Sequence, residues 1–139
     1  MARTRILLAD DNVELLAELC RELEKEFEIV GTVSNGQDAV DAVCRLDPDV
    51  VVLDITMPIL NGIKASLRIH ESHPRSKVLF LTIHEDPEFI SAAFSAGASA
   101  YVTKRRLAGD LVHAIQEVSQ GNVFVSPSLR RYLKSGQSP

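Results

Sequence analysis

The sequence predicts an α/β fold in which a parallel β-sheet carries helices on both faces. Short apolar runs alternate with amphipathic stretches along most of the chain, which is the pattern of repeated strand and helix units. The run Val50–Leu53 is apolar at every position, as a central strand buried on both faces requires. A length of 139 residues with 45% hydrophobic content suits one compact domain.

Five strands and five helices are expected in alternation. The strands span Arg5–Ala9, Ile29–Ser34, Val50–Leu53, Val78–Leu81 and Ala100–Val102. The helices span Val13–Phe27, Gly36–Leu46, Gly62–His73, the stretch between Asp86 and Gly97, and Ala108–Gln120. Asn12 is a natural cap for the first helix, and Asp86 for the fourth. Gly97 supplies a left-handed exit from the fourth helix.

The alternating pattern ends after Gly121. Residues 122–139 contain Leu129, Tyr132 and Leu133, which suffice for one or two weak helical turns before a polar end rich in Gly, Ser and Pro. We therefore expect residues 1–121 to form the domain and residues 122–139 to begin a linker.

Charge and composition narrow the classes of function. A net charge of −4 without a long basic run disfavours direct binding to nucleic acid or to an anionic membrane. No apolar run has the length of a signal peptide core or a membrane span. Cys20 and Cys44 fall on apolar faces of expected helices, so we expect small core residues in a reducing compartment. These features predict a cytoplasmic protein whose partners are proteins or small ions.

Polar residues follow four of the expected strands. They are Asp10 and Asp11 after the first strand, Asp54 after the third, Thr82 after the fourth and Lys104 after the fifth. Each residue type alone has a common structural role as a helix cap, a strand former or a solvated charge. Because ligands of open α/β sheets bind outside the carboxyl ends of the strands, the five together indicate one functional site.

This set of residues predicts aspartyl-phosphate chemistry. Two like charges about 4 Å apart repel by about 4 kcal/mol at the effective dielectric of a protein surface, so three carboxylates need a cation. Oxygen ligands with room for water and a phosphate favour Mg²⁺. Asp54 can then attack phosphorus as a nucleophile, while Lys104 and Thr82 interact with the phosphoryl oxygens.

Over residues 4–121 the sequence resembles the receiver domain of bacterial two-component response regulators. The resemblance rests on "ADDN" at 9–12, "LDITMPILNG" at 53–62, "LT" at 81–82, and the lysine three residues after Tyr101. It implies the flavodoxin-like fold, a (βα)5 three-layer sandwich with a five-stranded parallel sheet of order 2-1-3-4-5.

The resemblance also assigns roles to residues. It implies that Asp54 is phosphorylated and that Asp10, Asp11, Asp54 and the backbone carbonyl of Thr56 hold Mg²⁺. Thr82 and Tyr101 correspond to a coupled switch. We expect Thr82 to move towards the phosphoryl group and Tyr101 to fill the vacated space, which changes the face built from the fourth helix, fifth strand and fifth helix.

The function implied is a phosphorylation-dependent switch rather than a turnover enzyme. Its expected partners are a sensor histidine kinase and a second receiver, with no membrane contact. The tail resembles the linker of the branch with a C-terminal helix-turn-helix, so DNA would be bound only through an absent C-terminal domain. Alternatives are a Mg²⁺-dependent aspartyl phosphohydrolase, whose Asp-x-Asp motif is missing here, a flavodoxin, whose phosphate loop is missing, and an unphosphorylated docking module.

Four positions depart from the family pattern or vary within it. Ile83 follows the switch threonine where the family commonly has a small residue, and Arg105 follows Lys104 where many members have proline. Thr56 and His84 occupy positions that tune the lifetime of the phosphoryl group in the family.

Overall fold

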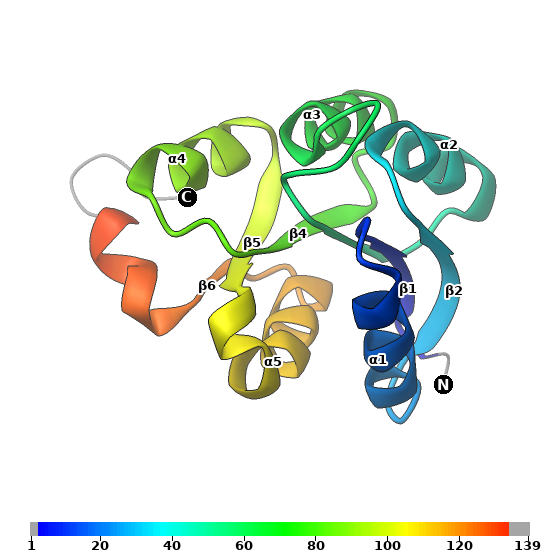
Figure 1. The fold of residues 1–139 in the computed structure, drawn as a ribbon, viewed down its shortest axis with the longest axis horizontal. Coiled ribbons are helices and arrows are strands. Elements are labelled where there is room, and N and C mark those ends of the chain that lie inside the picture. Colours follow the sequence, from blue (N-terminus) through cyan, green and yellow to red (C-terminus); the bar gives the residue numbers. More distant parts are fainter. Residues whose placement is uncertain (1–2, 134–139) are drawn as a thin grey trace.

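The computed structural model describes residues 3–133 as an open parallel sheet between two layers of helices (Figure 1). The strands are β1 (Arg5–Ala9), β2 (Glu28–Val33), β3 (Val50–Leu53), β4 (Lys77–Thr82), β5 (Ala98–Thr103) and β6 (Phe124–Val125). The helices are α1 (Val13–Leu23), α2 (Gly36–Leu46), α3 (Gly62–Ser72), α4 (Pro87–Ser95) and α5 (Leu107–Ser119), with short 3-10 turns η1 (Lys104–Arg106) and η2 (Pro127–Leu133). The expected α/β architecture is confirmed.

The sheet has six strands in the order β2-β1-β3-β4-β5-β6, so the prediction of five strands is wrong. β6 pairs in parallel with β5, where Ala100 faces Phe124 and Tyr101 faces Val125. A strand of two residues is too short to show an alternating pattern, which is why the sequence did not reveal it.

The sheet separates two apolar cores. Side chains of α2, α3 and α4 pack on one face, and those of α1 and α5 on the other (Figure 1). β3 contributes to both cores, since Val51 and Leu53 join the first and Val50 and Val52 the second. The prediction that β3 is a central strand buried on both faces is confirmed. Its carboxyl end is therefore held rigidly between two packed layers.

Local signals set most of the helix ends. The Asn12 side chain accepts a hydrogen bond from the backbone N–H of Leu15, as expected of a cap. α1 ends at Leu23 rather than at Phe27, although Phe27 remains buried after the helix. Asp86 precedes α4 without a side-chain capping bond. None of the helices within residues 3–133 combines the length and apolar character that a membrane crossing needs.

The two cysteines differ in exposure. Cys20 is partly buried, but Cys44 is exposed, so the prediction that both are core residues is wrong for Cys44. Val43 is the fully buried position of that helical turn. The next residue is rotated by about 100° around the helix axis and points away from the sheet.

The end of the described chain is part of the core. Leu129 in η2 is only 2% exposed, so replacing it with alanine should lower the free energy of unfolding by about 2–5 kcal/mol in urea denaturation. Val123→Ala is the matched control, because Val123 is 45% exposed and should change stability by about 0.5 kcal/mol or less. Equal stability of the two variants would contradict a structural role for η2.

Candidate functional site

The carboxyl ends of β1 and β3 bring three aspartates together. Ala9 pairs with Leu53, and the backbone N–H of Asp54 donates to the Ala9 carbonyl at 3.1 Å. One carboxylate oxygen from each of Asp10, Asp11 and Asp54 lies within 4.8 Å of the others. Asp10 and Asp54 are buried, and Asp11 is exposed. Two buried charges at this separation need a positive partner.

Lys104 is that partner. Its Nζ lies 2.8 Å from Asp10 Oδ2 and 3.0 Å from Asp54 Oδ2. Burial alone would lower the pKa of Lys104, but the hydrogen bonds to Asp10 and Asp54 outweigh it and hold the pKa above its usual value. The side chain is therefore a charged ammonium group shared between the two carboxylates.

Backbone amides fix the other oxygen of each buried carboxylate. The N–H of Asn12 donates to Asp10 Oδ1 at 2.9 Å, and the N–H of Ile55 donates to Asp54 Oδ1 at 2.7 Å. Hydrogen bonds of this kind restrict the rotation of the carboxylate. The orientation of the Asp54 side chain is thus fixed from both oxygens.

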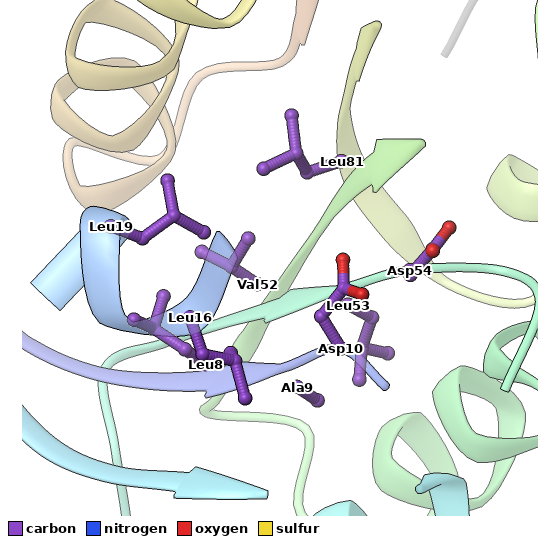
Figure 2. A pocket seen from close by; sticks show the side chains of 9 residues that line it. All are labelled: Leu8, Ala9, Asp10, Leu16, Leu19, Val52, Leu53, Asp54 and Leu81. Atoms are coloured by element: carbon purple, nitrogen blue, oxygen red, sulfur yellow. The ribbon is translucent and has the colours of Figure 1, made fainter. Parts of the chain in front are cut away.

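Aliphatic side chains of β1, α1, β3 and β4 fill the interior side of the site. Figure 2 shows Asp10 and Asp54 at the end of a small space whose other lining residues are Leu8, Ala9, Leu16, Leu19, Val52, Leu53 and Leu81. That space is too narrow for a water molecule. A ligand therefore cannot reach the Asp54 carboxylate through this space.

Thr82 and Tyr101 both bind the backbone of His84. The Thr82 hydroxyl accepts a long hydrogen bond of 3.3 Å from the His84 N–H, and the Tyr101 hydroxyl donates to the His84 carbonyl at 2.8 Å. Both side chains are fully buried. Burial raises the pKa of Tyr101, and nearby acidic groups including Asp54 raise it further, so the phenol stays a neutral donor. The Tyr101 ring is buried in this structure, while Thr82 remains bound to the His84 N–H.

A contact between Thr56 and His84 joins the loops after β3 and β4. Thr56 Oγ1 lies 2.9 Å from His84 Nε2, and the imidazole stacks on the Phe89 ring with centroids 4.2 Å apart. Sequence reasoning singled out both positions but did not connect them. Their equal spacing of two residues after Asp54 and after Thr82 was the available signal.

Two glycines allow the loop after Asp54 to pack closely. A Cβ atom on Gly62 would lie 2.0 Å from the Asp54 carbonyl oxygen, and one on Gly36 would lie 1.9 Å from the Leu60 carbonyl oxygen. Gly62 belongs to the motif recognised in the sequence, whereas Gly36, at the start of α2, was missed as a site residue. The Asn-Gly pair after the second strand was the signal for it.

Replacing Gly36 with alanine should displace the loop that follows Asp54. The new Cβ would strike backbone rather than a movable side chain, and displacements near 1 Å can slow a positioned reaction by about 10- to 100-fold. The rate of phosphorylation by acetyl phosphate measures this. Gly109→Ala is the control, because a Cβ there meets nothing closer than 3.6 Å. Unchanged rates in both variants would rule out a positioning role for Gly36.

Comparison with known proteins identifies the family. The family model of the response regulator receiver domain matches residues 6–116. The chain belongs to this family. The receiver domain is 37% identical over 128 residues to the transcriptional regulatory protein LnrK of Bacillus subtilis (strain 168), covering 90% of the chain and 58% of the relative. It is 34% identical over 134 residues to DegU of Brevibacillus brevis, covering 94% of the chain and 56% of the relative.

A solved structure agrees with this assignment. A LuxR-family two-component response regulator from Aurantimonas sp. SI85-9A1 superimposes with a TM-score of 0.90 at 30% identity, covering 95% of the receiver domain and 96% of that chain. The receiver domain spans a little over half the length of the two curated relatives. It functions in two-component signalling, and a phosphorylation-dependent switch is consistent with the family. Receiver domains of transcriptional regulators are in general not turnover enzymes.

Proposed function

We propose that the receiver domain accepts a phosphoryl group on Asp54 and that this modification switches its output. The observation that carries the proposal is the position of Lys104, whose ammonium group contacts both Asp10 and Asp54 next to the exposed carboxylate of Asp11. An oriented nucleophile, a cation and additional oxygen ligands are the parts that phosphoryl transfer requires.

The donor set fits Mg²⁺. Its atoms are all oxygen, which a hard cation prefers, and one carboxylate oxygen from each of the three aspartates lies within 4.8 Å of the others. We propose Asp10, Asp11, Asp54 and the backbone carbonyl of Thr56 as its protein ligands. When bound, the ion would offset the carboxylate repulsion and the charge on the phosphoryl oxygens.

The residues of the chain perform the remaining steps. A carboxylate oxygen of Asp54 attacks phosphorus in line, the bond between phosphorus and the donor nitrogen breaks, and the imidazole of a phosphohistidine leaves. The Lys104 ammonium group forms an ion pair with a phosphoryl oxygen. The Thr82 hydroxyl donates a hydrogen bond to another phosphoryl oxygen. The Ile55 N–H holds the second oxygen of Asp54 throughout. The product is an acyl phosphate on Asp54.

Intact mass after incubation with acetyl phosphate and Mg²⁺ tests this function against its alternatives. A gain of one phosphoryl group supports the switch. No gain supports an unphosphorylated docking module. Free phosphate released over many turnovers supports a Mg²⁺-dependent phosphohydrolase.

We also propose that the receiver domain is the N-terminal part of a cytoplasmic transcription regulator. The relatives are named transcriptional regulatory proteins, and the chain covers little more than half of each. A sensor histidine kinase would supply the phosphoryl group, a second receiver would be a dimer partner, and DNA would be bound by a C-terminal helix-turn-helix. The proposed receiver unit includes β6 and η2, beyond the boundary at residue 121 expected from the sequence.

Asp11 and Lys104 should contribute to different steps. Asp11→Ala should weaken Mg²⁺ binding by about tenfold or more, because it removes a charged ligand. Lys104→Ala should leave Mg²⁺ affinity unchanged or increase it, since it removes a cation bound to the same carboxylates, while slowing phosphorylation. Mg²⁺ titration followed by amide NMR measures the Mg²⁺ affinity of both variants. Equal affinity of the parent and Asp11→Ala proteins would argue against the proposed ligand set.

A further inference from the structure

The position of the Lys104 ammonium group depends on the short turn η1. This turn joins the end of β5 directly to the start of α5, and the Thr103 side chain makes no capping bond to it. The peptide bond between Lys104 and Arg105 is trans. Because 3-10 turns have poorer hydrogen-bond geometry than α-helices, contacts with neighbouring segments contribute to the placement of such a turn.

Arg105 binds the loop that follows β4. Its Nε donates to Glu85 Oε2 at 3.1 Å, and its Nη2 donates to Glu85 Oε1 at 2.6 Å. Both oxygens of one carboxylate thus meet one guanidinium group, which fixes the direction of the contact as well as its length. Glu85 is partly buried, whereas Arg105 is exposed. This pair connects η1 to a segment 20 residues earlier in the chain.

The loop at the other end of this contact is itself fixed. Glu85 follows His84, whose backbone N–H donates to Thr82 Oγ1 at 3.3 Å. The His84 carbonyl accepts from the Tyr101 hydroxyl at 2.8 Å. Thr82 and Tyr101 are both fully buried. The backbone next to Glu85 is therefore tied to β4 and β5, and Arg105 holds η1 to that point.

Lys104 needs this support most when the site is loaded. Its Nζ contacts Asp10 and Asp54, and the proposed function assigns both carboxylates to Mg²⁺ as well. An ammonium group that leaves them for a phosphoryl oxygen is held only by a flexible four-carbon chain and by the backbone of η1. Because small displacements slow a positioned reaction, the placement of η1 then affects the rate of transfer.

We propose that Arg105 is a positioning residue for phosphoryl transfer. Its pair with Glu85, which we call the clamp, holds η1 against the loop after β4 and so places the Lys104 ammonium group at the phosphoryl oxygen. Arg105 acts through Lys104 and does not itself contact the phosphoryl group. The clamp rests on the proposed phosphorylation of Asp54.

Phosphorylation rates of the whole chain with acetyl phosphate and Mg²⁺, followed by intact mass, test the clamp. Arg105→Ala should slow phosphorylation by about two- to fivefold, since exposed ion pairs make modest contributions. Glu85→Ala should slow it equally, and the double variant should be no slower than either single variant. Arg75→Ala is the matched control, because Arg75 is a similarly exposed arginine that pairs with Asp47 before the start of β4. It should be phosphorylated at the parental rate.

Two other roles of Arg105 give different results. If Arg105 served only to attract the anionic donor, Glu85→Ala would free its charge and speed phosphorylation. If the pair served only to stabilise the fold, Arg105→Ala would also slow phosphorylation of a Lys104→Ala protein. The clamp predicts no further loss in the Lys104→Ala protein, because the group that it positions is already missing. Either of the two opposite results would overturn the clamp.

The clamp and the proposed function can fail separately. If the parent protein gains a phosphoryl group and Arg105→Ala gains it at the parental rate, the clamp is wrong and phosphorylation of Asp54 stands. If the parent protein gains none, the proposed function fails, and the clamp fails with it.

Discussion

Asp54→Asn is expected to abolish phosphorylation of the receiver domain by acetyl phosphate and Mg²⁺. The amide keeps the size of the carboxylate but lacks the anionic oxygen that attacks phosphorus. It also removes the negative charge from the ion pair with Lys104. Intact mass spectrometry should show one added phosphoryl group on the parent protein and none on the variant.

The control is an aspartate of the same chain outside the site. Asp41 is exposed on α2, so Asp41→Asn should be phosphorylated at the parental rate. A stable phosphoryl group of the same lability on the Asp54→Asn protein would show that another residue is the acceptor. Loss of phosphorylation in both variants would point to a general defect rather than to the role of Asp54.

Thr82→Ala is expected to become phosphorylated but to switch poorly. The equilibrium constant between the active and the inactive state of the phosphorylated protein should be about 10- to 100-fold lower than in the parent. Moving a two-state equilibrium from 1:99 to 99:1 takes about 5.5 kcal/mol, and a hydrogen bond to a charged group contributes about 1.5–3 kcal/mol of it. Phosphorylation adds a charge of about −1.5 to −2, and the Thr82 hydroxyl is one of the few donors at this edge. Thr82→Ser should retain the hydroxyl and most of the switching.

The His84 amide provides the readout. Its N–H now donates to the Thr82 hydroxyl, so that bond must break when the hydroxyl turns towards the phosphoryl group. With beryllofluoride, the NMR signals of His84 and of Phe89 to Ala96 should shift in the parent and much less in Thr82→Ala. Because the Tyr101 hydroxyl donates to the His84 carbonyl, the signals of Tyr101 should shift together with those of His84. Changes confined to the loop after Asp54 would contradict this mechanism.

The sequence was sufficient for features that repeat over many residues. β3 was predicted with its observed bounds, because four consecutive apolar residues that end at an aspartate are typical of a short strand buried on both faces. The polar ends of β1 and β3 were expected to meet, and Asp10 and Asp54 do share Lys104. The apolar pattern places both aspartates at the carboxyl edge of a parallel sheet, whereas the adjacency of β1 and β3 was implied by the resemblance to receiver domains.

Features that depend on single tertiary contacts could not be predicted in this way. The two residues of β6 form a strand only because β5 offers an unpaired edge. Gly36 is constrained by the carbonyl of Leu60, which is distant in the sequence, and His84 by the Thr56 hydroxyl. No local propensity encodes such contacts. Cys44 was misplaced for a related reason, since one step along a helix turns a side chain from the core to solvent.

The site spans nearly the whole chain, because Asp10 follows the first strand and Lys104 the fifth. At a synthesis rate of about 5–20 residues per second, the ribosome needs roughly 5–20 s to make the about 90 residues between them. For about the last 50 residues of that interval, a nascent chain has all three aspartates but not the Lys104 ammonium group that pairs with Asp10 and Asp54. On the proposed function, a ribosome-bound receiver domain therefore acquires its complete phosphorylation site only when β5 has docked.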